Sequence, residues 1–228
     1  MPDPELRLDL DRRRRTGLAE AVYAPGKSPP QCALAVAGLL ADGEGPVLLT
    51  RADEAQAAAA EEANPGPTST AVGADSAGTD LCTLTWRAAP PRKGSALVLT
   101  AGTSDLPVAR EAEVVLAAYG HATTVVADAG VAGLHRVLEE QENLERADVV
   151  IVVAGMEGAL ASVATGLTSA PVIAVPTSTG YGSGLDGVTA LLAMMASCSP
   201  GVSVVGIDNG FGAACAAVRI LQSHEEER

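Results

Sequence analysis

The sequence predicts an α/β fold, a doubly wound and flavodoxin-like parallel sheet that is preceded by a small N-terminal α/β domain. Two observations support this prediction. From about residue 95 onward, short apolar runs alternate five times with segments of helical character. These runs are rich in β-branched residues and apolar on both faces, which is typical of parallel strands covered by helices on both sides. We place the domains at residues 1–90 and 91–228.

The larger domain is predicted to contain five strands, at residues 95–101, 123–129, 148–155, 171–177 and 202–208. Each strand leads into a predicted helix, at residues 107–119, 133–146, 158–167, 184–197 and 210–223. Right-handed crossovers join such strands into one open sheet. Because ligands of open parallel sheets bind beyond the carboxyl ends of the strands, the residues that follow each strand are the candidates for a site.

The first 90 residues predict helices at 29–42 and 53–64 and strands at 46–52 and 81–88. Residues 64–80 are rich in Gly, Ser, Thr and Pro and predict a loop, and residues 89–95 predict a linker. Four consecutive arginines, Arg12 to Arg15, predict a solvated helix face, with contact to phosphate as the alternative.

Composition excludes several classes of function. The formal net charge is -13 and the isoelectric point is near 4.5, so nucleic acid is not expected as a partner. Aromatic residues make up 2% of the chain, which disfavours recognition of single strands by stacking. No apolar run reaches the roughly 18 residues that span a bilayer, and the first residues lack a signal-like apolar segment. We therefore expect no membrane partner and a cytoplasmic location.

The cysteines are widely spaced, without a CxxC pair, at positions 32, 82, 198 and 215. This spacing favours reduced thiols over disulfides, and neither the cysteines nor the histidines predict a metal site. Cys215 lies in an Ala-rich predicted helix and reads as a small core residue. Cys198 lies where a helix ends before Pro200 and is the better nucleophile candidate. A helix-to-strand loop lies at the amino edge of its sheet, however, so Cys198 reaches the site only across a subunit interface or by an unusual loop path.

The first candidate site follows the strand at 95–101 and consists of Gly102, Thr103, Ser104 and Asp105. Small residues before a helix let an anion approach backbone N–H groups at the helix N-terminus. Ser or Asp before Pro107 is equally typical of ordinary helix capping. The two readings are compatible, and for Asp105 both stay open.

The loops after the other strands supply the remaining candidates. Glu157 is flanked by glycines at a helix start, where a carboxylate also simply favours the helix dipole. His135 and Arg136 are ligand candidates, although a histidine on a helix is more often structural. Hydroxyls and glycines after the fourth strand suit phosphate or carboxylate oxygens. The other candidates in these loops are Asp128, Thr177, Ser178, Gly182 and Asn209. No loop matches GxGxxG or a Walker A sequence, which disfavours a simple dinucleotide or NTP fold.

Several long motifs in order resemble a known family. "VLTAGTSDLPVAREA", "VVAGMEGALASVATGL" and "PVIAVPTSTGYG" resemble the PurE superfamily of carboxyaminoimidazole ribonucleotide mutases. "GVAGLHR", "GMEGAL", "SCSPGV", "IDNGFGAACAA" and the upstream "DRRRRTGLAEAVYAPGK" are more similar to one branch, the LarB family of pyridinium-3,5-biscarboxylic acid mononucleotide synthases in nickel-pincer cofactor assembly. The likeness spans nearly the whole chain and implies a PurE-like fold for the larger domain.

The resemblance implies an enzyme that carboxylates nicotinic acid adenine dinucleotide with CO2 as co-substrate and cleaves its diphosphate to release AMP. By the matching motifs, Cys198 would be a thiolate that adds to the pyridinium ring, and Glu157 a base that removes the ring proton. Ser104 and Asp105 would position CO2 or the ring carboxylate. Lys27 and the loop at 177–183 would contact the diphosphate.

Partners and cofactors are expected on the same basis. We expect no tightly bound cofactor, leave a role for Mg2+ open, and expect a homo-oligomer, with an octamer as one form. Two alternatives remain. One is a PurE-like mutase acting on an aminoimidazole ribonucleotide, which needs no thiol and whose Ser-Ala-His-Arg loop is replaced here by "ADAGVAGLHR". The other is a non-catalytic nucleotide-binding module, for which Cys198→Ser would leave binding unchanged.

Overall fold

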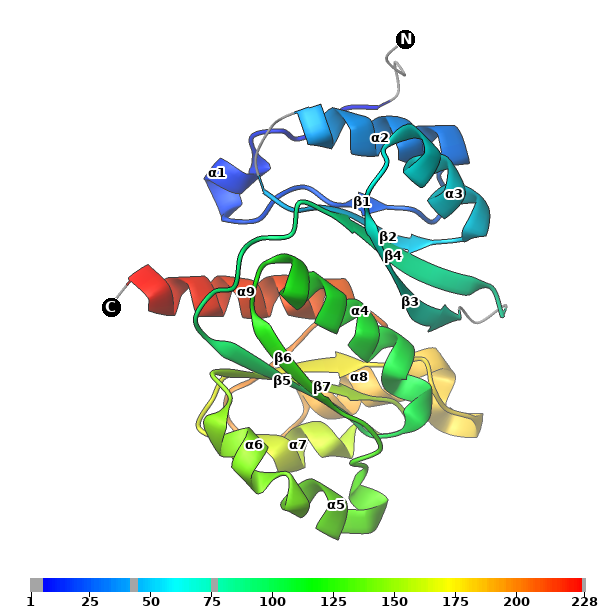
Figure 1. The fold of residues 1–228 in the computed structure, drawn as a ribbon. Coiled ribbons are helices and arrows are strands. Elements are labelled where there is room, and N and C mark those ends of the chain that lie inside the picture. The colour runs from blue at the N-terminus through cyan, green and yellow to red at the C-terminus, as the bar shows by residue number, and fades with distance from the viewer. Residues whose placement is uncertain (1–5, 42–44, 75–77, 227–228) are drawn as a thin grey trace. The chain divides into compact units, whose positions relative to one another are not determined.

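The structure of the chain is a computed structural model that describes residues 6–41, 45–74 and 78–226 (Figure 1). Its internal contacts divide the chain into two compact units. The first consists of Met1–Pro90 with Ala117–Gly120, and the second of Pro91–Leu116 with His121–Arg228. Each unit has its own sheet and its own hydrophobic cluster.

The second unit is built on a five-stranded sheet in which every pairing is parallel. Its strands are β5 (Ser95–Thr100), β6 (Ala122–Val126), β7 (Val149–Ala154), β8 (Val172–Pro176) and β9 (Val202–Val204). They lie in the order β6-β5-β7-β8-β9, so the first strand along the chain lies second in the sheet. This order confirms the flavodoxin-like fold that the sequence predicts.

Helices follow every strand of this sheet, as the sequence predicts. They are α4 (Leu106–Ala118), α5 (Leu134–Glu139), α6 (Gln141–Arg146), α7 (Ala159–Thr165), α8 (Val188–Met195) and α9 (Gly210–Glu226), with short 3-10 turns η1 (Thr103–Asp105), η2 (Val131–Gly133) and η3 (Gly182–Gly187). The single helix predicted at 133–146 is wrong in one respect. Glu140, at φ -88° and ψ 9°, leaves the helical backbone and separates α5 from α6.

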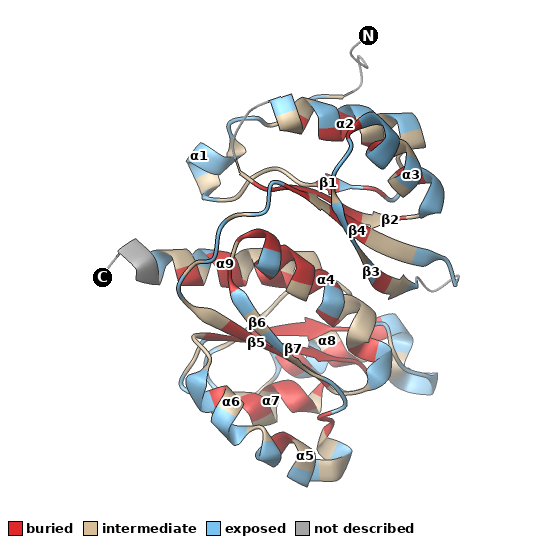
Figure 2. Cartoon of the chain, viewed as in Figure 1, coloured by how far each residue is buried: buried red, intermediate tan, exposed pale blue. Residues whose placement is uncertain are grey.

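The core of this unit lies on both faces of the sheet. Helices α5, α6, α7 and α8 cover one face, where Val137, Leu144, Leu160 and Met194 join the alternate strand residues in one buried cluster. Helices α4 and α9 lie together over the other face (Figure 1). The strands β7 and β8 are buried along their whole length (Figure 2). Burial on both faces explains why these strands read as continuous apolar runs.

The first unit contains a four-stranded sheet in the order β1-β2-β4-β3. Its strands are β1 (Val22–Tyr23), β2 (Val47–Ala52), β3 (Thr68–Ala74) and β4 (Asp80–Trp86), and α2 (Pro29–Ala41) and α3 (Glu54–Ala63) pack on one face. β1 and β2 are parallel, and the other two pairings are antiparallel. Trp86 anchors the sheet by donating its indole N–H to the carbonyl oxygen of Asn64 at 2.8 Å.

The prediction of a loop at 64–80 is wrong for residues 68–74 and for Asp80, which lie in strands, and is confirmed for residues 64–67 and 78–79, while residues 75–77 lie outside the described residues. Residues 68–74 form β3 and pair with β4, because small hydroxyl-bearing and β-branched residues fit a strand once a partner supplies the ladder. β3 lies at the edge of the sheet. Its register shifts between Ala71 and Gly73, where Gly73 has a φ of 111°.

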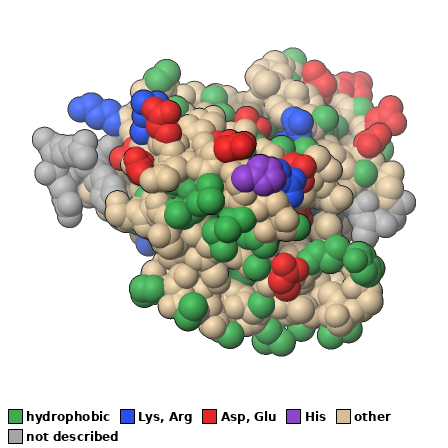
Figure 3. All heavy atoms as spheres, turned by 90° about the horizontal axis from the view of Figure 1, so that it is seen from below, with side chains coloured by type: hydrophobic (Ala, Val, Ile, Leu, Met, Phe, Trp, Pro, Cys, Tyr) green, Lys and Arg blue, Asp and Glu red, His purple; other side chains and the backbone are tan. Residues whose placement is uncertain are grey.

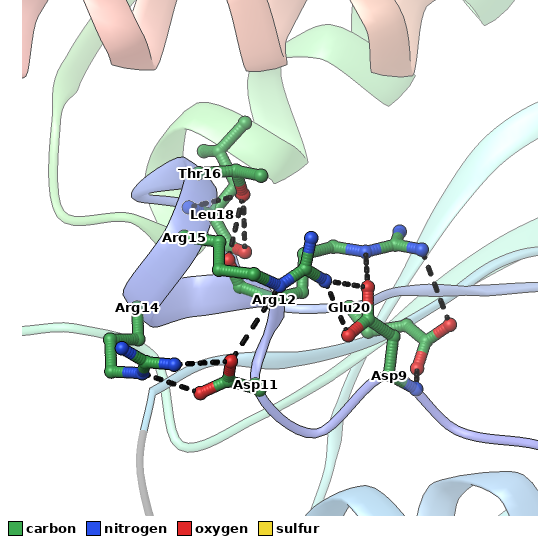
Figure 4. Close-up of polar contacts among 8 residues, drawn as sticks. All are labelled: Asp9, Asp11, Arg12, Arg14, Arg15, Thr16, Leu18 and Glu20. Carbon is green, nitrogen blue, oxygen red and sulfur yellow. Dashed lines mark hydrogen bonds and ion pairs between the residues drawn. The ribbon is translucent and has the colours of Figure 1, made fainter.

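The four arginines lie in a short helix, α1 (Arg12–Thr16), and Arg12, Arg14 and Arg15 pair with nearby carboxylates (Figure 4). Arg14 makes two contacts with Asp11, at 2.7 and 2.8 Å, and Arg15 donates to Asp9 at 2.6 Å. Arg13, Arg14 and Arg15 are exposed, which confirms the solvated helix face. Within the described ranges, no helix is both long and apolar enough to cross a membrane.

Candidate functional site

The carboxyl ends of the strands in the second unit bring several predicted site residues together around Asp105. Asp105 is 2% exposed. One of its carboxylate oxygens accepts a hydrogen bond from the Thr177 hydroxyl at 2.6 Å, and the other accepts from the Gly102 N–H at 2.9 Å. Thr177 follows β8 and is itself 1% exposed. Two loops from different strands therefore meet at one buried carboxyl group.

The surroundings of Asp105 raise the pKa of its carboxyl group. Burial is the main cause, since it disfavours the charged form, and the negative charge of Asp208 acts in the same direction. Hydrogen bonds from Thr177, Gly102 and Thr179 favour the charged form and offset part of the rise. A carboxyl group with a raised pKa holds its proton closer to neutral pH and can donate or accept it during a reaction.

Asp208 and Asp128 extend this site to the neighbouring strands. Asp208, after β9, accepts a hydrogen bond from the Ser178 N–H at 2.8 Å, and its own N–H donates to the carbonyl of Pro176 at 2.8 Å. The N–H of Asp128, after β6, donates to the Thr100 hydroxyl at 3.2 Å. Hydrogen bonds thus link the loops after β5, β6, β8 and β9 along one edge of the sheet.

Glycines permit the close packing of these loops. A Cβ on Gly155 would lie 2.2 Å from the carbonyl oxygen of Thr179 and 2.8 Å from the Thr177 hydroxyl. A Cβ on Gly130 would lie 2.5 Å from the carbonyl oxygen of Ala101. At both positions the neighbouring backbone occupies the space of a side chain, so only glycine fits without a shift.

Backbone strain is concentrated at the same edge. Seven non-glycine residues in the described ranges have a positive φ, and five of them follow strands of the second unit. These five are Asp128, Met156, Leu185, Asp186 and Asp208. Left-handed conformations cost energy for residues that carry a Cβ, less so for the three Asp than for Met156 and Leu185, and they gather at functional sites. The strain therefore points to the carboxyl edge as the functional part of this unit.

Arg136 supplies a cation at this edge. Its guanidinium lies 2.7 Å from a carboxylate oxygen of Asp128 and donates to the carbonyl of Gly130 at 3.2 Å. The Arg136 and Asp128 side chains are 33% and 54% exposed, so both remain accessible to a ligand. His135, the neighbouring candidate, is exposed near the start of α5.

The other candidates at this edge are more exposed. Thr103 and Ser104 lie in η1, and the carbonyl of Ser104 accepts from the Thr179 hydroxyl at 3.4 Å. Glu157 is exposed after β7, next to Met156, whose N–H donates to the carbonyl of Thr179 at 3.0 Å. The Asn209 side chain caps α9 by accepting from the Gly212 N–H at 2.7 Å. Gly182 begins η3 and is exposed.

Cys198 lies apart from these residues within the same chain. It is exposed in the segment between α8 and β9, and this segment leads to the amino end of β9. Serines on both sides of the thiol are tied to α7. The hydroxyls of Ser197 and Ser162 lie 2.7 Å apart, and the Ser199 hydroxyl donates to the Ser162 carbonyl at 2.8 Å. Cys32 is buried, and Cys82 and Cys215 are half-buried.

Lys27 belongs to the first unit, where its ammonium group donates to the carbonyl of Tyr23 at 2.7 Å. A small hollow in this unit, lined by residues that include Asp9, Arg13 and Glu20, holds about 20 Å³, little more than a water molecule needs. Among the residues that the structure describes, no group of three or more His, Cys, Asp or Glu side chains could hold a metal ion.

Sequence reasoning left several residues of the site without a role. Thr100 has no predicted role, and its place as the last residue of β5 is the signal that could have identified it. Thr179 is predicted only as part of the loop at 177–183, without a role of its own. Arg136 is a ligand candidate of the sequence together with His135, and the structure adds its ion pair with Asp128. Glu111 gave no signal, because a glutamate in a helix reads as a solvated residue, yet it is 2% exposed.

Comparison with known proteins places both parts of the chain. Residues 95–228 match the family described as AIR carboxylase, and residues 5–73 match the LarB/PurE-like N-terminal domain. An uncharacterized protein of Methanocaldococcus jannaschii is 38% identical over 213 residues, which cover 92% of this chain and 82% of that protein.

Two further relatives match the larger domain. The N5-carboxyaminoimidazole ribonucleotide mutase of Methanocaldococcus jannaschii is 37% identical over 134 residues, which cover 57% of this chain and 80% of the mutase. The crystal structure of a PurE2 variant from Treponema denticola covers 60% of this chain and 91% of that chain, with 19% identity and a TM-score of 0.43.

Proposed function

Because this chain belongs to the AIR carboxylase family and carries a LarB/PurE-like N-terminal domain, we propose that it carboxylates the pyridinium ring of nicotinic acid adenine dinucleotide with CO2 and hydrolyses the diphosphate. The products would be pyridinium-3,5-biscarboxylic acid mononucleotide and AMP. A carboxylase or mutase activity follows from the family, and the choice of substrate is the proposal.

The observation that carries the proposal is the exposed thiol of Cys198, since the other three cysteines are buried or half-buried. A pyridinium carbon is electrophilic and cannot attack CO2 directly. Addition of a thiolate to the ring forms an electron-rich dihydropyridine whose carbon can attack. A mutase acting on an aminoimidazole has no such need for an accessible thiol.

The carboxylation proceeds in three steps, and the hydrolysis is a separate step in which one water cleaves a P–O bond of the diphosphate and leaves AMP and the mononucleotide. The Cys198 thiolate first forms a C–S bond to the ring, and the electron pair moves into the dihydropyridine. The ring carbon then forms a C–C bond to CO2, and Glu157 takes the proton from that carbon. Expulsion of the thiolate breaks the C–S bond and restores the aromatic pyridinium. In the net change, one ring proton is replaced by a carboxylate.

The carboxyl edge offers groups for the rest of the substrate. Ser104 and the buried Asp105 would position CO2 or the carboxylate of the ring. The exposed Ser178 hydroxyl, Gly182 and the half-exposed Arg136 are suited to diphosphate oxygens. Local donors of this kind are needed because the net charge of -13 would repel an anion at long range. A contact between Lys27 and the diphosphate stays a prediction.

A second copy of the chain would complete this site. Cys198 precedes β9, whereas Asp105 follows β5, so the two residues lie at opposite edges of one parallel sheet. The outer side of α8 offers a surface for self-association, since Val188, Leu192 and Met195 are 40%, 61% and 69% exposed. Hydrophobic side chains gather in several places on the face seen in Figure 3. Apolar exposure of this kind marks an interaction surface, and a homo-oligomer, with an octamer as one form, would cover it.

The decisive experiment is mass spectrometry of the purified protein incubated with nicotinic acid adenine dinucleotide and bicarbonate. Wild type and Cys215→Ser should form the carboxylated mononucleotide and AMP, and Cys198→Ser should form no carboxylated product. Turnover of an aminoimidazole ribonucleotide, with no carboxylated pyridinium, would instead assign the mutase activity named for the 37% identical relative. Binding without any turnover, unchanged in Cys198→Ser, would leave a nucleotide-binding module.

Complementation tests whether Cys198 acts from a second copy. Cys198→Ser and Asp105→Asn chains are each expected to be inactive. Oligomers that contain both kinds of chain should recover part of the activity, because some sites then combine an intact thiol with an intact carboxyl group. A mixture as inactive as its components would place both groups in one chain's site.

A further inference from the structure

Glu111 lies in the second turn of α4 and has no role in the reaction proposed above, yet it is 2% exposed. One of its carboxylate oxygens accepts a hydrogen bond from the Phe211 N–H at 3.1 Å. Phe211 is the second residue of α9, where backbone N–H groups have no partner within the helix. A buried carboxylate is costly unless it is well bonded, so its position at this helix end calls for an explanation.

The starts of α4 and α9 are also in direct backbone contact. A Cβ on Gly210 would lie 2.2 Å from the carbonyl oxygen of Val108 and 3.1 Å from a carboxylate oxygen of Glu111. Only a glycine allows the first residue of α9 to approach α4 this closely. Glu111 therefore fixes the start of α9 at a point where no side chain separates the two helices.

Contacts lead from this point back to Asp105. Asp208 lies two residues before the start of α9, and its carboxylate accepts a hydrogen bond from the Ser178 N–H at 2.8 Å. Ser178 adjoins Thr177, whose hydroxyl donates to Asp105 at 2.6 Å. Asp105 is the last residue of η1, and α4 begins at the next residue. Hydrogen bonds and short covalent segments therefore form a closed circuit: Glu111, Phe211, Asp208, Ser178, Thr177, Asp105 and back along α4 to Glu111.

We propose that Glu111 is a positioning residue, which fixes the loops that carry Asp105, Thr177 and Asp208 by holding the first turn of α9 against α4. Glu111 acts through backbone groups and does not touch the substrate. The proposal rests on the proposed function in one respect, since it takes Asp105 as part of the reacting site. The claim that Glu111 fixes these loops does not depend on which substrate the protein binds.

Hydrogen exchange tests the geometric part directly. Mass spectrometry would follow backbone exchange in peptides that cover residues 101–106 and 176–180 in wild type and in Glu111→Leu, which removes the acceptor at similar volume. We expect exchange in both segments to become at least tenfold faster, because the circuit is opened. An increase in exchange that is confined to the first turn of α9, with both of these segments unchanged, would overturn the proposal.

Two further variants cover the case in which Glu111→Leu does not fold. Glu111→Gln keeps an acceptor oxygen at the same reach, and Glu111→Asp keeps the charge but is one methylene shorter. We expect the Gln variant to resemble wild type and the Asp variant to exchange faster in both segments. The opposite ranking would show that the charge, not the hydrogen bond, matters. Glu113→Leu, which alters a second carboxylate on α4, is the matched control.

Kinetics of the carboxylation provide the second readout. A positioning role predicts that Glu111→Asp lowers kcat at least tenfold and leaves KM within about twofold, with recovery in Glu111→Gln. Equal losses in the Gln and Asp variants would contradict it. If wild type shows no carboxylation at all, the proposed function fails, while the exchange result still decides the role of Glu111.

Discussion

The two edges of the five-stranded sheet differ in how they hold Asp105 and Cys198, two residues to which the proposed function gives chemical roles. At the carboxyl edge, Asp105 is 2% exposed and is bonded to Thr177 and Gly102, and the neighbouring backbone is strained. At the amino edge, Cys198 is exposed, and hydrogen bonds reach only the serines beside it. A carboxyl group keeps its proton to higher pH when it is buried, and fixed hydrogen-bond partners hold it in place. A nucleophile, the role proposed for Cys198, needs access, so the proposed roles place these two demands at separate edges of the sheet.

A substitution at Gly155 would disrupt the tight packing at the carboxyl edge, and we expect the largest loss of stability there. In Gly155→Ala the new methyl group would meet the Thr179 carbonyl at 2.2 Å, which should destabilise the fold by about 3 kcal/mol. Gly184→Ala is the matched control. A Cβ on Gly184 has no atom within 4 Å, and we expect a change below about 0.5 kcal/mol. Urea denaturation followed by circular dichroism measures both, and equal stabilities would refute the close packing.

The exposed position of Cys198 at the amino edge predicts that its thiol reacts faster than a buried thiol. Cys198 is exposed, whereas Cys32 is 0% exposed and burial raises the pKa of its thiol. The thiolate is the reactive form, so we expect iodoacetamide to modify Cys198 at least about tenfold faster than Cys32. Peptide mass spectrometry after brief labelling gives both rates. Comparable rates at the two cysteines would argue against the exposed position of Cys198.

Burial of Asp105 predicts a dependence of stability on pH. Its pKa in the folded chain lies above the unfolded value of 3.8, so the folded state keeps this proton longer than the unfolded state. Below pH 3.8 both states are protonated, and as the pH rises through the folded pKa the fold loses stability. The loss is about 1.4 kcal/mol for each tenfold rise in proton affinity.

Asp105→Asn removes the titrating carboxyl group and therefore isolates its contribution to the pH dependence of the free energy of unfolding. The free energy of unfolding of wild type minus that of Asp105→Asn should fall between pH 3 and pH 7. Denaturation of both proteins at several pH values measures the difference. A difference that stays constant, or rises with pH, would mean that hydrogen bonds to the carboxylate outweigh its burial.

The smallest effect on stability is expected at Ser162 of α7, which binds the two serines beside Cys198. Ser162→Ala removes one hydroxyl of the pair that lies 2.7 Å apart, and we expect a loss of about 1 kcal/mol. Ser203→Ala, on the exposed side of β9, should be neutral. Denaturation midpoints compare the two variants. If both variants match wild type, these serines do not hold the segment that carries the thiol.

Much of the second unit is predictable because its strands are continuous apolar runs such as 149–154, which few other structures accommodate. Loops after these strands must share one edge, so the grouping of Gly102, Asp105, Thr177 and Asn209 could be inferred from topology alone. β1 and β3 escaped prediction for the opposite reason. Each depends on a neighbouring strand for its hydrogen bonds, and a two-residue strand leaves no periodic pattern.

Contacts between distant residues were beyond sequence reasoning. Asp105 and Thr177 are 72 positions apart, and Glu111 and Phe211 are 100 apart. The residues around each member of a pair do not indicate which distant residue it contacts. A serine or threonine in a loop and a glutamate in a helix are both expected to be exposed to solvent. The pairs follow from the order of strands and the angle at which helices cross them, and these emerge only from the complete packing.

The irregularity in β3 has a consequence for the behaviour of the protein at high concentration. An edge strand offers unpaired N–H and C=O groups on which a strand from another molecule can build, the first step toward aggregates. The shift in register at Gly73, with its φ of 111°, bends the strand and interrupts the even spacing of those groups. A strand from another molecule would find no regular row of hydrogen-bonding groups there, so we expect this break to limit edge-to-edge association of the protein.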